Sequence, residues 1–352
     1  MAFITQSAPA ETRWGILATG KIARSFAENL QATPGARIAA VGSRSLDSSH
    51  AFAAAYGGPQ ARAHASYTEL VNDPDVDVVY IASPHALHLE HARLAFDAGK
   101  HVLCEKALTL NTPDAEEMIQ LAGERGLFLM EAMWMACHPV ILAVRDGLRA
   151  GRFGTPLQVH ADLGFIVDRP PTDRVLDPSL GGGALLDMGI YPLTFAYLML
   201  GEPEALTAVA SLTDQGVDGD VAIAGRYAAG AVAALTSTLT SMSPRNATIA
   251  TDRGLIDVPA DFHHPTHAVF TPADGSPPVT INGAAPVLGT GLGNEAAEVM
   301  RCLRDGLLES PLVPHAQTLS LMRQMDTIRA QIGVRYAADE RSLRAGASAA
   351  DL

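Results

Sequence analysis

Two short segments carry the residue types that proton transfer at a carbon–oxygen bond needs. Cys104-Glu105-Lys106-Ala107 supplies a carboxylate and an ammonium group, and the segment from Gly181 to Pro192 supplies Asp187 and Tyr191. If the second segment is helical, Asp187 and Tyr191 lie one turn apart on the same face. Oxidation of an alcohol by hydride transfer requires removal of a proton, and reduction of a ketone requires the supply of one. Lys106, Asp187 and Tyr191 are therefore candidate catalytic residues for such a reaction.

Each segment also has an ordinary structural explanation. The first is consistent with an exposed ion pair beyond a strand, and the second with a helix-capping acid beside a core aromatic ring. Gly181-Gly182-Gly183 and Gly189 favour a special role, because a glycine inside a helix costs about 1 kcal/mol relative to alanine. Close approach of the backbone to a ligand would explain that cost, and Pro192 predicts a kink. The two segments together, rather than either alone, indicate catalysis.

A turn typical of phosphate binding precedes these segments. The residues from Trp14 to Ala23 run from an apolar strand into a helical pattern, and a helix N-terminus offers free N–H groups to a pyrophosphate. Against the pattern G-x-G-x-x-G/A, this turn has Ala18, Gly20 and Ala23 at the three small positions. The residues expected to meet the cofactor phosphates are Thr19, Gly20, Lys21 and Ile22.

The end of the second strand predicts which dinucleotide is bound. It reads Val41-Gly42-Ser43-Arg44-Ser45, where a Rossmann protein contacts the adenosine ribose. An Asp or Glu there would accept a hydrogen bond from the 2′-OH of NAD, and neither is present. Ser43 and Arg44 can instead donate to a 2′-phosphate, unless Arg44 is simply a solvated surface residue. The sequence therefore predicts NADP, with NAD as the open alternative.

The elements that position these residues form a repeating pattern in the first third of the chain. Short apolar runs alternate with helical patterns from Arg13 to about Met133, which indicates βαβ units around a parallel sheet. The expected strands are 14–18, 37–41, 76–82, 101–104 and 128–131. We therefore predict an α/β protein whose residues 1–135 form a dinucleotide-binding Rossmann domain.

The pattern changes after Trp134. The expected elements are helices at 139–149 and 184–200, a strand through 159–165, short strands between 205 and 282, and helices at 294–307 and 315–334. Turn signals separate the short strands, which favours an antiparallel sheet. Residues 136–352 are thus predicted to form a substrate-binding and dimerisation α+β domain with a large, mostly antiparallel sheet.

Composition limits the possible partners. The chain is 48% hydrophobic and 18% charged, as expected of a folded globular protein. Its formal net charge of −13 argues against nucleic acid, because affinity for a phosphate backbone comes from clustered Lys and Arg. Residues 1–10 lack the pattern of a signal peptide, and the apolar stretch 221–235 is too short for a membrane span. We expect neither nucleic acid nor membrane as a partner.

Cysteine and histidine spacing bears on location and metals. Cys104, Cys137 and Cys302 lack metal-ligand spacing and fit a reducing compartment, so we expect a cytoplasmic protein.

His85, His88 and His91 have an i, i+3, i+6 spacing, which places the outer two about 120° apart around a helix. No carboxylate or thiolate completes a ligand set, and no metal is expected.

Together these motifs resemble the glucose-fructose oxidoreductase, inositol dehydrogenase and rhizopine-catabolism (Gfo/Idh/MocA) family, and within it the branch of dihydrodiol dehydrogenase and NADP-linked D-xylose dehydrogenase. The motifs that carry the resemblance are the turn from Ala18 to Ala23, Ser43-Arg44, Pro84 with His88, Glu105-Lys106, Glu131-Ala132-Met133-Trp134, the block from Gly181 to Pro192 and the helix from Glu295 to Leu308.

The resemblance implies a role for each candidate residue. Lys106 is implied to hold the nicotinamide ribose and the reacting oxygen, and Tyr191 to donate and accept the proton with Asp187 beside it. Because an ammonium next to a phenol favours the phenolate, we expect the pKa of Tyr191 to move from about 10 towards neutrality. The further implied contacts are Ser83, Pro84, His88 and Glu105 on the cofactor side, and Trp134 and Phe165 on the substrate side.

The resemblance also implies a carbohydrate-like substrate (a sugar, sugar derivative or diol) and a homodimer or dimer of dimers that pairs through open sheet faces. Two alternatives are a non-catalytic NADP-binding sensor and an enzyme that recycles a tightly bound cofactor on one sugar.

The sequence departs from the family at three points. Ala107 stands where a proline is usual, and Ala18 replaces the turn glycine. Met135-Ala136-Cys137 replaces Thr-Arg-Phe after Trp134, which removes an expected arginine from the substrate side.

Overall fold

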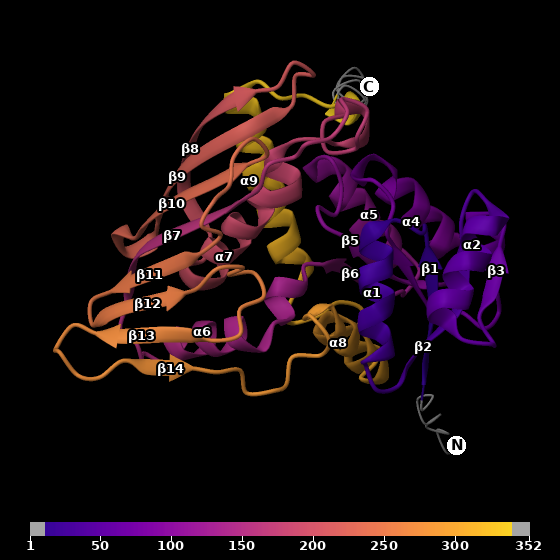
Figure 1. Cartoon of the computed structure of the whole chain (residues 1–352), viewed down its shortest axis with the longest axis horizontal. Coiled ribbons are helices and arrows are strands. Elements are labelled where there is room, and N and C mark those ends of the chain that lie inside the picture. The colour runs from indigo at the N-terminus through magenta and orange to yellow at the C-terminus, as the bar shows by residue number, and fades with distance from the viewer. Residues whose placement is uncertain (1–10, 340–352) are drawn as a thin grey trace.

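The repeating pattern of the first third forms a six-stranded parallel sheet in a computed structural model that describes residues 11–339 (Figure 1). The strand order is β3-β2-β1-β4-β5-β6, which is the order of a dinucleotide-binding Rossmann sheet. The strands are β1 (Thr12–Leu17), β2 (Ala36–Gly42), β3 (Arg62–His64), β4 (Val78–Ile81), β5 (His101–Glu105) and β6 (Leu129–Ala132). The predicted N-terminal fold is confirmed, although the three-residue edge strand β3 was not among the predicted strands.

Helices cover both faces of this sheet, so its central strands are buried on both sides. They are α1 (Lys21–Gln31), α2 (Leu46–Phe52), the π-helical turn η1 (Ala53–Gly57), α3 (Tyr67–Val71), the 3₁₀ turn η2 (His85–Leu87), α4 (His88–Asp97) and α5 (Thr112–Glu124). Their apolar residues and the strand side chains form one core, in which Phe26 stacks on Tyr80 with ring centroids 3.8 Å apart.

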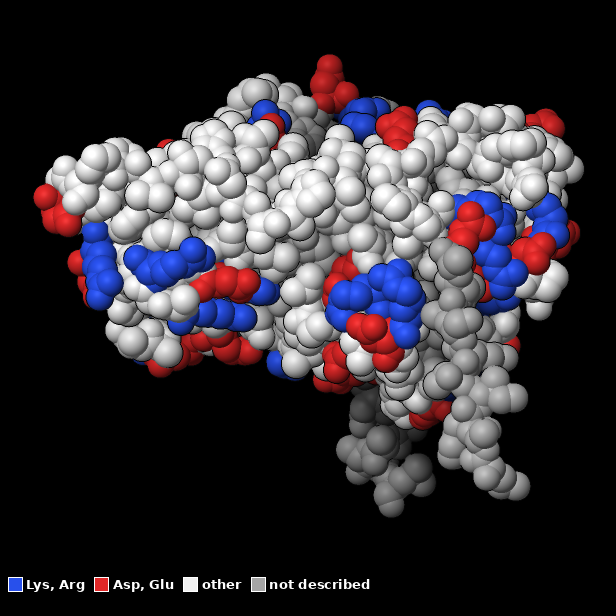
Figure 2. All heavy atoms as spheres, turned by 90° about the horizontal axis from the view of Figure 1, so that it is seen from below, with Lys and Arg blue, Asp and Glu red and all other residues white. Residues whose placement is uncertain are grey.

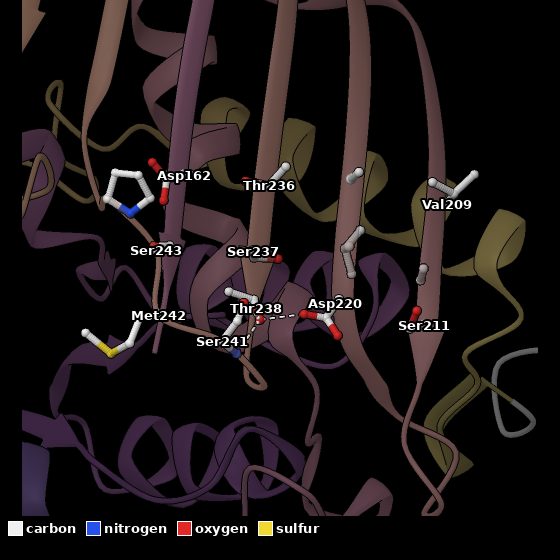
Figure 3. A pocket seen from close by; sticks show the side chains of 14 residues that line it. Asp162, Val209, Ser211, Asp220, Thr236, Ser237, Thr238, Ser241, Met242 and Ser243 are labelled. Atoms are coloured by element: carbon white, nitrogen blue, oxygen red, sulfur yellow. Dashed lines mark hydrogen bonds between the residues drawn. The ribbon is translucent and has the colours of Figure 1, made fainter. Parts of the chain in front are cut away.

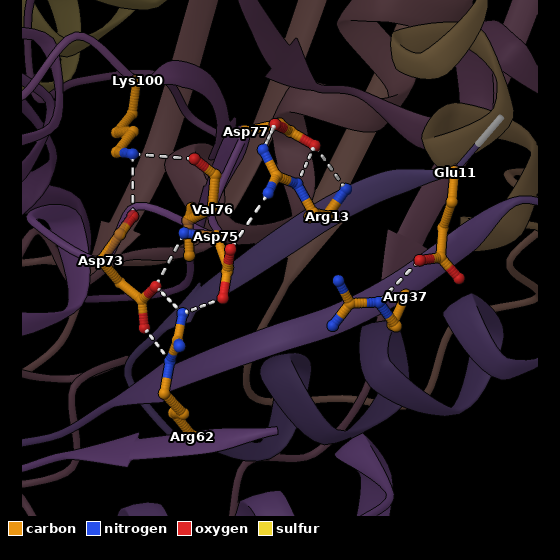
Figure 4. Close-up of polar contacts among 9 residues, drawn as sticks. All are labelled: Glu11, Arg13, Arg37, Arg62, Asp73, Asp75, Val76, Asp77 and Lys100. Carbon is orange, nitrogen blue, oxygen red and sulfur yellow. Dashed lines mark hydrogen bonds and ion pairs between the residues drawn. The ribbon is translucent and has the colours of Figure 1, made fainter. Parts of the chain in front are cut away.

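Ionic contacts join the strands at their amino ends (Figure 4). Arg13 at the start of β1 contacts Asp77 just before β4, with an N–O distance of 2.6 Å. Lys100 donates to the backbone oxygens of Asp73 and Val76 at 2.9 and 2.8 Å. Because α/β proteins bind ligands at the carboxyl ends of parallel strands, this network lies at the end of the sheet opposite the expected ligand site.

A second, eight-stranded sheet follows the 3₁₀ turn η3 (Trp134–Cys137) and helix α6 (Pro139–Arg149). Its order is β14-β13-β12-β11-β7-β10-β9-β8, and all neighbours are antiparallel except β7 and β10. The strands are β7 (Pro156–Gly164), β8 (Pro203–Leu212), β9 (Asp218–Tyr227), β10 (Val232–Thr238), β11 (Ala247–Thr251), β12 (Gly254–Val258), β13 (Ala268–Pro272) and β14 (Val279–Ile281). The predicted large, mostly antiparallel sheet is therefore confirmed.

One face of this sheet is covered by helices and the other is open. Strands β9 and β10 alternate buried and exposed residues, as expected of a sheet with one face in the core. The covering elements are the π-helical turn η5 (Leu185–Gly189), α7 (Ile190–Leu200) and α9 (His315–Ile332). The short 3₁₀ turn η6 (Ala228–Gly230) joins β9 to β10, and the 3₁₀ turn η4 (Pro178–Leu180) lies against η2.

The segment Pro178–Leu200 is long and apolar enough, by length and composition, to cross a membrane. In the fold, 83% of its most apolar window is buried. Its hydrophobicity is thus explained by its position between the second sheet and the other helices.

Helix α8 (Leu292–Arg304) returns to the first domain and lies beside α1 (Figure 1). The Thr290 N–H just before it donates to the side-chain oxygen of Asn29 at 2.8 Å, and Asn29 donates to the Thr290 hydroxyl at 3.1 Å. A second link joins Thr112 and Asp326, whose side chains are 2.6 Å apart. These contacts fix the second sheet relative to the carboxyl ends of β4 and β5.

Figure 2 shows one face of the molecule, on which Lys and Arg side chains lie next to Asp and Glu. On this face the basic residues do not merge into a continuous patch.

Candidate active site

The turn between β1 and α1 has the backbone expected of a phosphate-binding loop. Ala18 adopts a φ of 78°, the left-handed conformation that the family's glycine takes without strain. Gly20 caps α1 without a side-chain hydrogen bond, and the first turn of α1 contains no acidic residue. Gly20, Lys21 and Ile22 are exposed, and Thr19 is half-buried. The first N–H groups of α1 are therefore available to an anion.

Ser43 and Arg44 lie directly after β2, on the same edge of the sheet. Ser43 is buried and its hydroxyl accepts a hydrogen bond from the Ser45 N–H at 3.3 Å, whereas Arg44 is exposed. Arg44 borders a hollow of about 530 Å³ that Tyr67 and His91 also line. An exposed guanidinium beside a hollow fits a ribose phosphate.

The structure brings Lys106, Asp187 and Tyr191 together from segments more than 80 residues apart. The Lys106 ammonium donates to the backbone oxygen of Asp187 at 2.6 Å and lies 3.4 Å from its carboxylate. The same ammonium is 5.1 Å from the centre of the Tyr191 ring. This arrangement places an ammonium, a carboxylate and a phenol around one point at the end of β5.

A π-helical turn, rather than a simple kink, precedes Pro192. Residues 185–189 form the π turn η5, and Pro192 lies in the first turn of α7. Such turns are rare and often occur at functional sites. Asp187 lies within the π turn and Tyr191 in α7, which turns both towards Lys106.

Packing within the fold accounts for the glycine triplet. Gly181 and Gly183 have φ of 83° and 125°. A Cβ at Gly181 would collide with Leu110, and one at Gly183 with the carboxylate of Asp218. The close neighbours are thus other parts of this chain.

Arg174 is a site residue that sequence reasoning missed. Both terminal nitrogens of its guanidinium lie 3.3 Å from the Asp187 carboxylate, and 49% of its side chain is exposed. Burial alone would raise the pKa of Asp187, but the charges of Lys106 and Arg174 hold it well below its ordinary value. Arg174 comes from the irregular segment after β7, so no periodic pattern pointed to it.

The pKa of Tyr191 moves in the opposite direction to our expectation. Burial, together with the negative charges of Glu105 and Asp187, raises the pKa of this phenol well above 10. The expectation considered only Lys106, which pairs with Asp187 instead of the phenol oxygen. Trp134 Nε1 donates a hydrogen bond to Tyr191 Oη at 2.7 Å, and this bond partly offsets the increase in the pKa of Tyr191. Within the described residues that oxygen has no other hydrogen bond, so its own proton is available to a substrate.

His88 does not face the cofactor as expected. Its ring is fully buried, with Nε2 2.8 Å from the Ser83 oxygen and Nδ1 3.1 Å from the oxygens of Ala107 and Leu108. Burial lowers its pKa to about 4. His88 is therefore a positioning residue that fixes the chain after Lys106.

His85 has a similar role. Its ring nitrogens lie 3.1 Å from the Gly181 oxygen and 3.0 Å from the Lys106 oxygen, and burial lowers its pKa to about 3. Because a neutral imidazole has one N–H, only one of these oxygens accepts a hydrogen bond from it at neutral pH. The ring joins the glycine segment to the lysine segment.

The remaining predicted residues occupy mixed positions. Ser83 and Pro84 follow β4 at the ligand edge, and the Ser83 hydroxyl is 2.8 Å from His91 Nδ1. The Glu105 side chain is buried and accepts a hydrogen bond from the Tyr80 hydroxyl, so it points into the core rather than towards a cofactor. Phe165 follows β7 with 43% of its side chain exposed.

Two histidines that were not predicted as site residues lie near Tyr191 and Trp134. His263 lies 5.0 Å from the Tyr191 ring between centroids, and His264 stacks on Trp134 at 5.2 Å. They come from the turn after β12, far from Tyr191 in sequence, and only the folded sheet brings them to the site.

Both parts of the chain match models of a known protein family. Residues 12–133 match the family described as "Oxidoreductase family, NAD-binding Rossmann fold", and residues 141–257 match "GFO/IDH/MocA C-terminal domain". The chain is 36% identical to a trans-1,2-dihydrobenzene-1,2-diol dehydrogenase from Danio rerio, over 93% of this chain and 98% of that one. It is 34% identical to a D-xylose 1-dehydrogenase (NADP(+)) from Hypocrea jecorina, over 93% of this chain and 94% of that one.

A similar solved structure is a 3-ketoreductase from Actinomadura kijaniata in complex with NADP and TDP-benzene. Its TM-score is 0.80 at 28% identity, and the alignment covers 92% of this chain and 98% of that chain.

Proposed function

Because the chain belongs to the Gfo/Idh/MocA oxidoreductase family, we propose that it transfers hydride between NADP(H) and a hydroxyl or ketone of a sugar, sugar derivative or diol. The observation that carries the proposal is the convergence of Lys106, Asp187 and Tyr191 at the ligand edge of the Rossmann sheet. The relatives described above are named for a diol, a pentose and a ketone. The reactions in these names all interconvert a hydroxyl and a carbonyl group.

The first turn of α1 and the end of β2 fit a dinucleotide phosphate. Gly20 has open space where a Cβ would stand, and the first N–H groups of α1 lack side-chain caps. Arg44 is exposed where the 2′-phosphate would lie, and Ser43-Arg44-Ser45 directly after β2 contains no acidic residue to repel it. NADP, when bound, accepts or supplies the hydride at its nicotinamide.

Tyr191 moves the proton. Its raised pKa keeps the phenol protonated at neutral pH, so its O–H can donate to a ketone oxygen during reduction. Proton donation leaves a phenolate, which the hydrogen bond from Trp134 stabilises. In the oxidative direction this phenolate takes the proton of the alcohol. Lys106, held by Asp187, orients the reacting oxygen and offsets its developing negative charge.

An absorbance assay at 340 nm tests the proposal and separates it from its alternatives. The purified chain is mixed with NADP⁺ or NAD⁺ and a set of aldoses and diols, and with NADPH and keto-sugars. The proposal predicts turnover with at least one member of the set and a preference for the phosphorylated cofactor. Cofactor binding without turnover would favour a sensor, whereas cofactor that copurifies and does not exchange would favour a recycling enzyme.

The same proposal includes a homodimer. The open face of the second sheet exposes Val209 and Met242, at 68% and 69%, and between them lies a hollow of about 650 Å³ lined by strands β7 to β10 (Figure 3). Ala222 and Ala224 on β9 and Ala234 on β10 are exposed and add apolar surface to this face, beside the hydroxyl groups of Ser211 and Thr236. Exposed apolar side chains with a polar surround are typical of a protein interface. Light scattering of the wild type and of Val209→Asp should show a dimer that the charge weakens, and a monomeric wild type would refute it.

We place this chemistry in the cytoplasm. Cys104, Cys137 and Cys302 are free and buried, as expected in a reducing compartment. Cell fractionation with an antibody to the chain tests this, and recovery outside the cytoplasmic fraction would contradict it.

A further inference from the structure

The turn after β12 gathers three side chains with metal-ligand chemistry. One potential donor atom from each of Asp261, His263 and His264 lies within 4.8 Å of the other two. The turn is closed by a hydrogen bond of 2.8 Å from the His264 N–H to the Asp261 backbone oxygen. Phe262, which is fully buried, anchors the turn in the core. The backbone therefore holds the three side chains together independently of any ligand.

The donor atoms are available for coordination. His263 Nδ1 is buried and has no hydrogen-bond partner among the described residues, although a buried ring nitrogen usually has one. The Asp261 carboxylate has one ionic partner in the described chain, Arg245, at 3.4 Å, and both side chains are half-exposed. Such an exposed ion pair contributes little and can be displaced.

The three donors match the ligands of zinc. Zn²⁺ binds imidazole nitrogen and carboxylate oxygen at about 2.0–2.2 Å, and two donors of a tetrahedral site lie about 3.3 Å apart. Because no pair of donor atoms here is more than 4.8 Å apart, the atoms would have to approach by at most about 1.5 Å, which side-chain rotation provides. Three protein ligands leave the fourth coordination position of a tetrahedral zinc ion open.

We propose that Asp261, His263 and His264 form a binding site for a divalent zinc ion beside the active-site aromatic rings. Asp261 contributes a carboxylate oxygen, and His263 and His264 contribute one ring nitrogen each. His263 is 5.0 Å from the Tyr191 ring and His264 is 5.2 Å from the Trp134 ring, so the ion sits where a substrate approaches Tyr191. Bound zinc therefore inhibits oxidoreduction reversibly.

The direct test is a zinc titration of the full chain. Protein freed of metal by dialysis against a chelator is titrated with Zn²⁺ by calorimetry, and with Co²⁺ by visible absorbance. We expect one ion per chain and intense cobalt bands typical of tetrahedral coordination. His263→Ala and His264→Ala should each weaken zinc binding at least about tenfold, since even outer-shell partners are worth that much.

His267→Ala is the matched control, because His267 is on the same segment and its ring contacts Thr266 instead of the cluster. It should bind zinc as the wild type does. If His263→Ala fails to fold, His264→Ala and Asp261→Asn carry the test, since both remove a half-exposed ligand. Absence of saturable binding to the wild type, or equal binding by the His264 and His267 variants, would overturn the proposal. Because the titration measures binding directly, its result does not depend on whether turnover has been found.

Discussion

Trp134 Nε1 lies 2.7 Å from Tyr191 Oη and donates a hydrogen bond to it across the junction of the two domains. Trp134 follows the last strand of the parallel sheet, and Tyr191 lies in the first turn of α7 beneath the second sheet. The bond fixes the phenol oxygen and is the contact that lowers its pKa against the effects of burial and of Glu105.

Replacement of Trp134 by phenylalanine should shift the pH dependence of the reaction. Loss of the hydrogen bond destabilises the phenolate, so the pKa of Tyr191 rises further and the pH–rate profile moves to higher pH, by about one unit. Because this pKa lies well above 10, the shift is measured as a roughly tenfold fall in the steady-state rate of alcohol oxidation at each pH between 6 and 10. A larger KM with an unchanged profile would instead indicate that Trp134 only packs against the substrate.

Replacement of Arg44 by glutamine should weaken NADPH binding about 10- to 100-fold, because a hydrogen bond to a charged group is worth about 1.5–3 kcal/mol. NADH binding should stay unchanged. Fluorescence titration with both cofactors measures the difference. Arg37→Gln is the control, since Arg37 lies at the other end of β2 and pairs with Glu11. Equal losses for NADPH and NADH would contradict a contact with the 2′-phosphate.

Replacement of Ala18 by glycine should stabilise the protein. The left-handed conformation costs a residue with a Cβ about 1–2 kcal/mol, and glycine removes this cost. Glycine also raises the conformational entropy of the unfolded chain, which offsets part of the stabilisation. We expect a net increase of roughly 0.5–1 kcal/mol in the free energy of unfolding. Ala330→Gly, at an exposed position of α9, should have the opposite effect. Urea denaturation checks both, and a destabilised Ala18 variant would show that the turn is not strained.

Replacement of Glu295 by glutamine should remove a pH dependence of stability. Both carboxylate oxygens of Glu295 are buried without a hydrogen-bond partner in the described chain, and burial raises its pKa well above 4.5. The folded state therefore keeps a proton that the unfolded state loses, and stability falls as pH rises above about 4.5. The variant should gain stability relative to the wild type by more at pH 8 than at pH 5. Because one pKa unit is worth about 1.4 kcal/mol, the difference should exceed about 1 kcal/mol.

Glu298 on the same helix is the contrasting control. Burial alone would raise its pKa, but its bonds with Arg301 and Ser310 lower the pKa below its ordinary value. Glu298→Gln should therefore be less stable than the wild type above the ordinary carboxyl pKa. If urea midpoints of both variants changed alike with pH, the assignment for Glu295 would be wrong.

Features that depend on local pattern could be predicted from the sequence. The strand–turn–helix at Ala18 to Ala23 and the glycine-capped helices each leave a periodic or compositional signal, and the predicted fold of both domains is confirmed. Lys106, Asp187 and Tyr191 were also named, because motif chemistry and family resemblance pointed to the same residues.

Features that depend on three-dimensional neighbours could not be predicted. Arg174 and the pair His263 and His264 lie on irregular segments, where no period indicates the direction of a side chain. The pKa of Tyr191 was expected to fall because only Lys106 was considered, whereas burial and the nearby carboxylates raise it. His88 was placed at the cofactor by its position after β4, yet its ring turns inward to backbone oxygens.

The most direct test of the account is the turnover of Tyr191→Phe with a substrate found in the absorbance assay. The change removes the proton donor and retains the ring, so kcat should fall by about 10²–10⁴-fold while NADPH affinity stays nearly constant. Tyr197→Phe, six positions later on α7 and half-exposed, should keep wild-type kcat. A Tyr191 variant that retains wild-type turnover would contradict the assignment of this phenol as the acid and base.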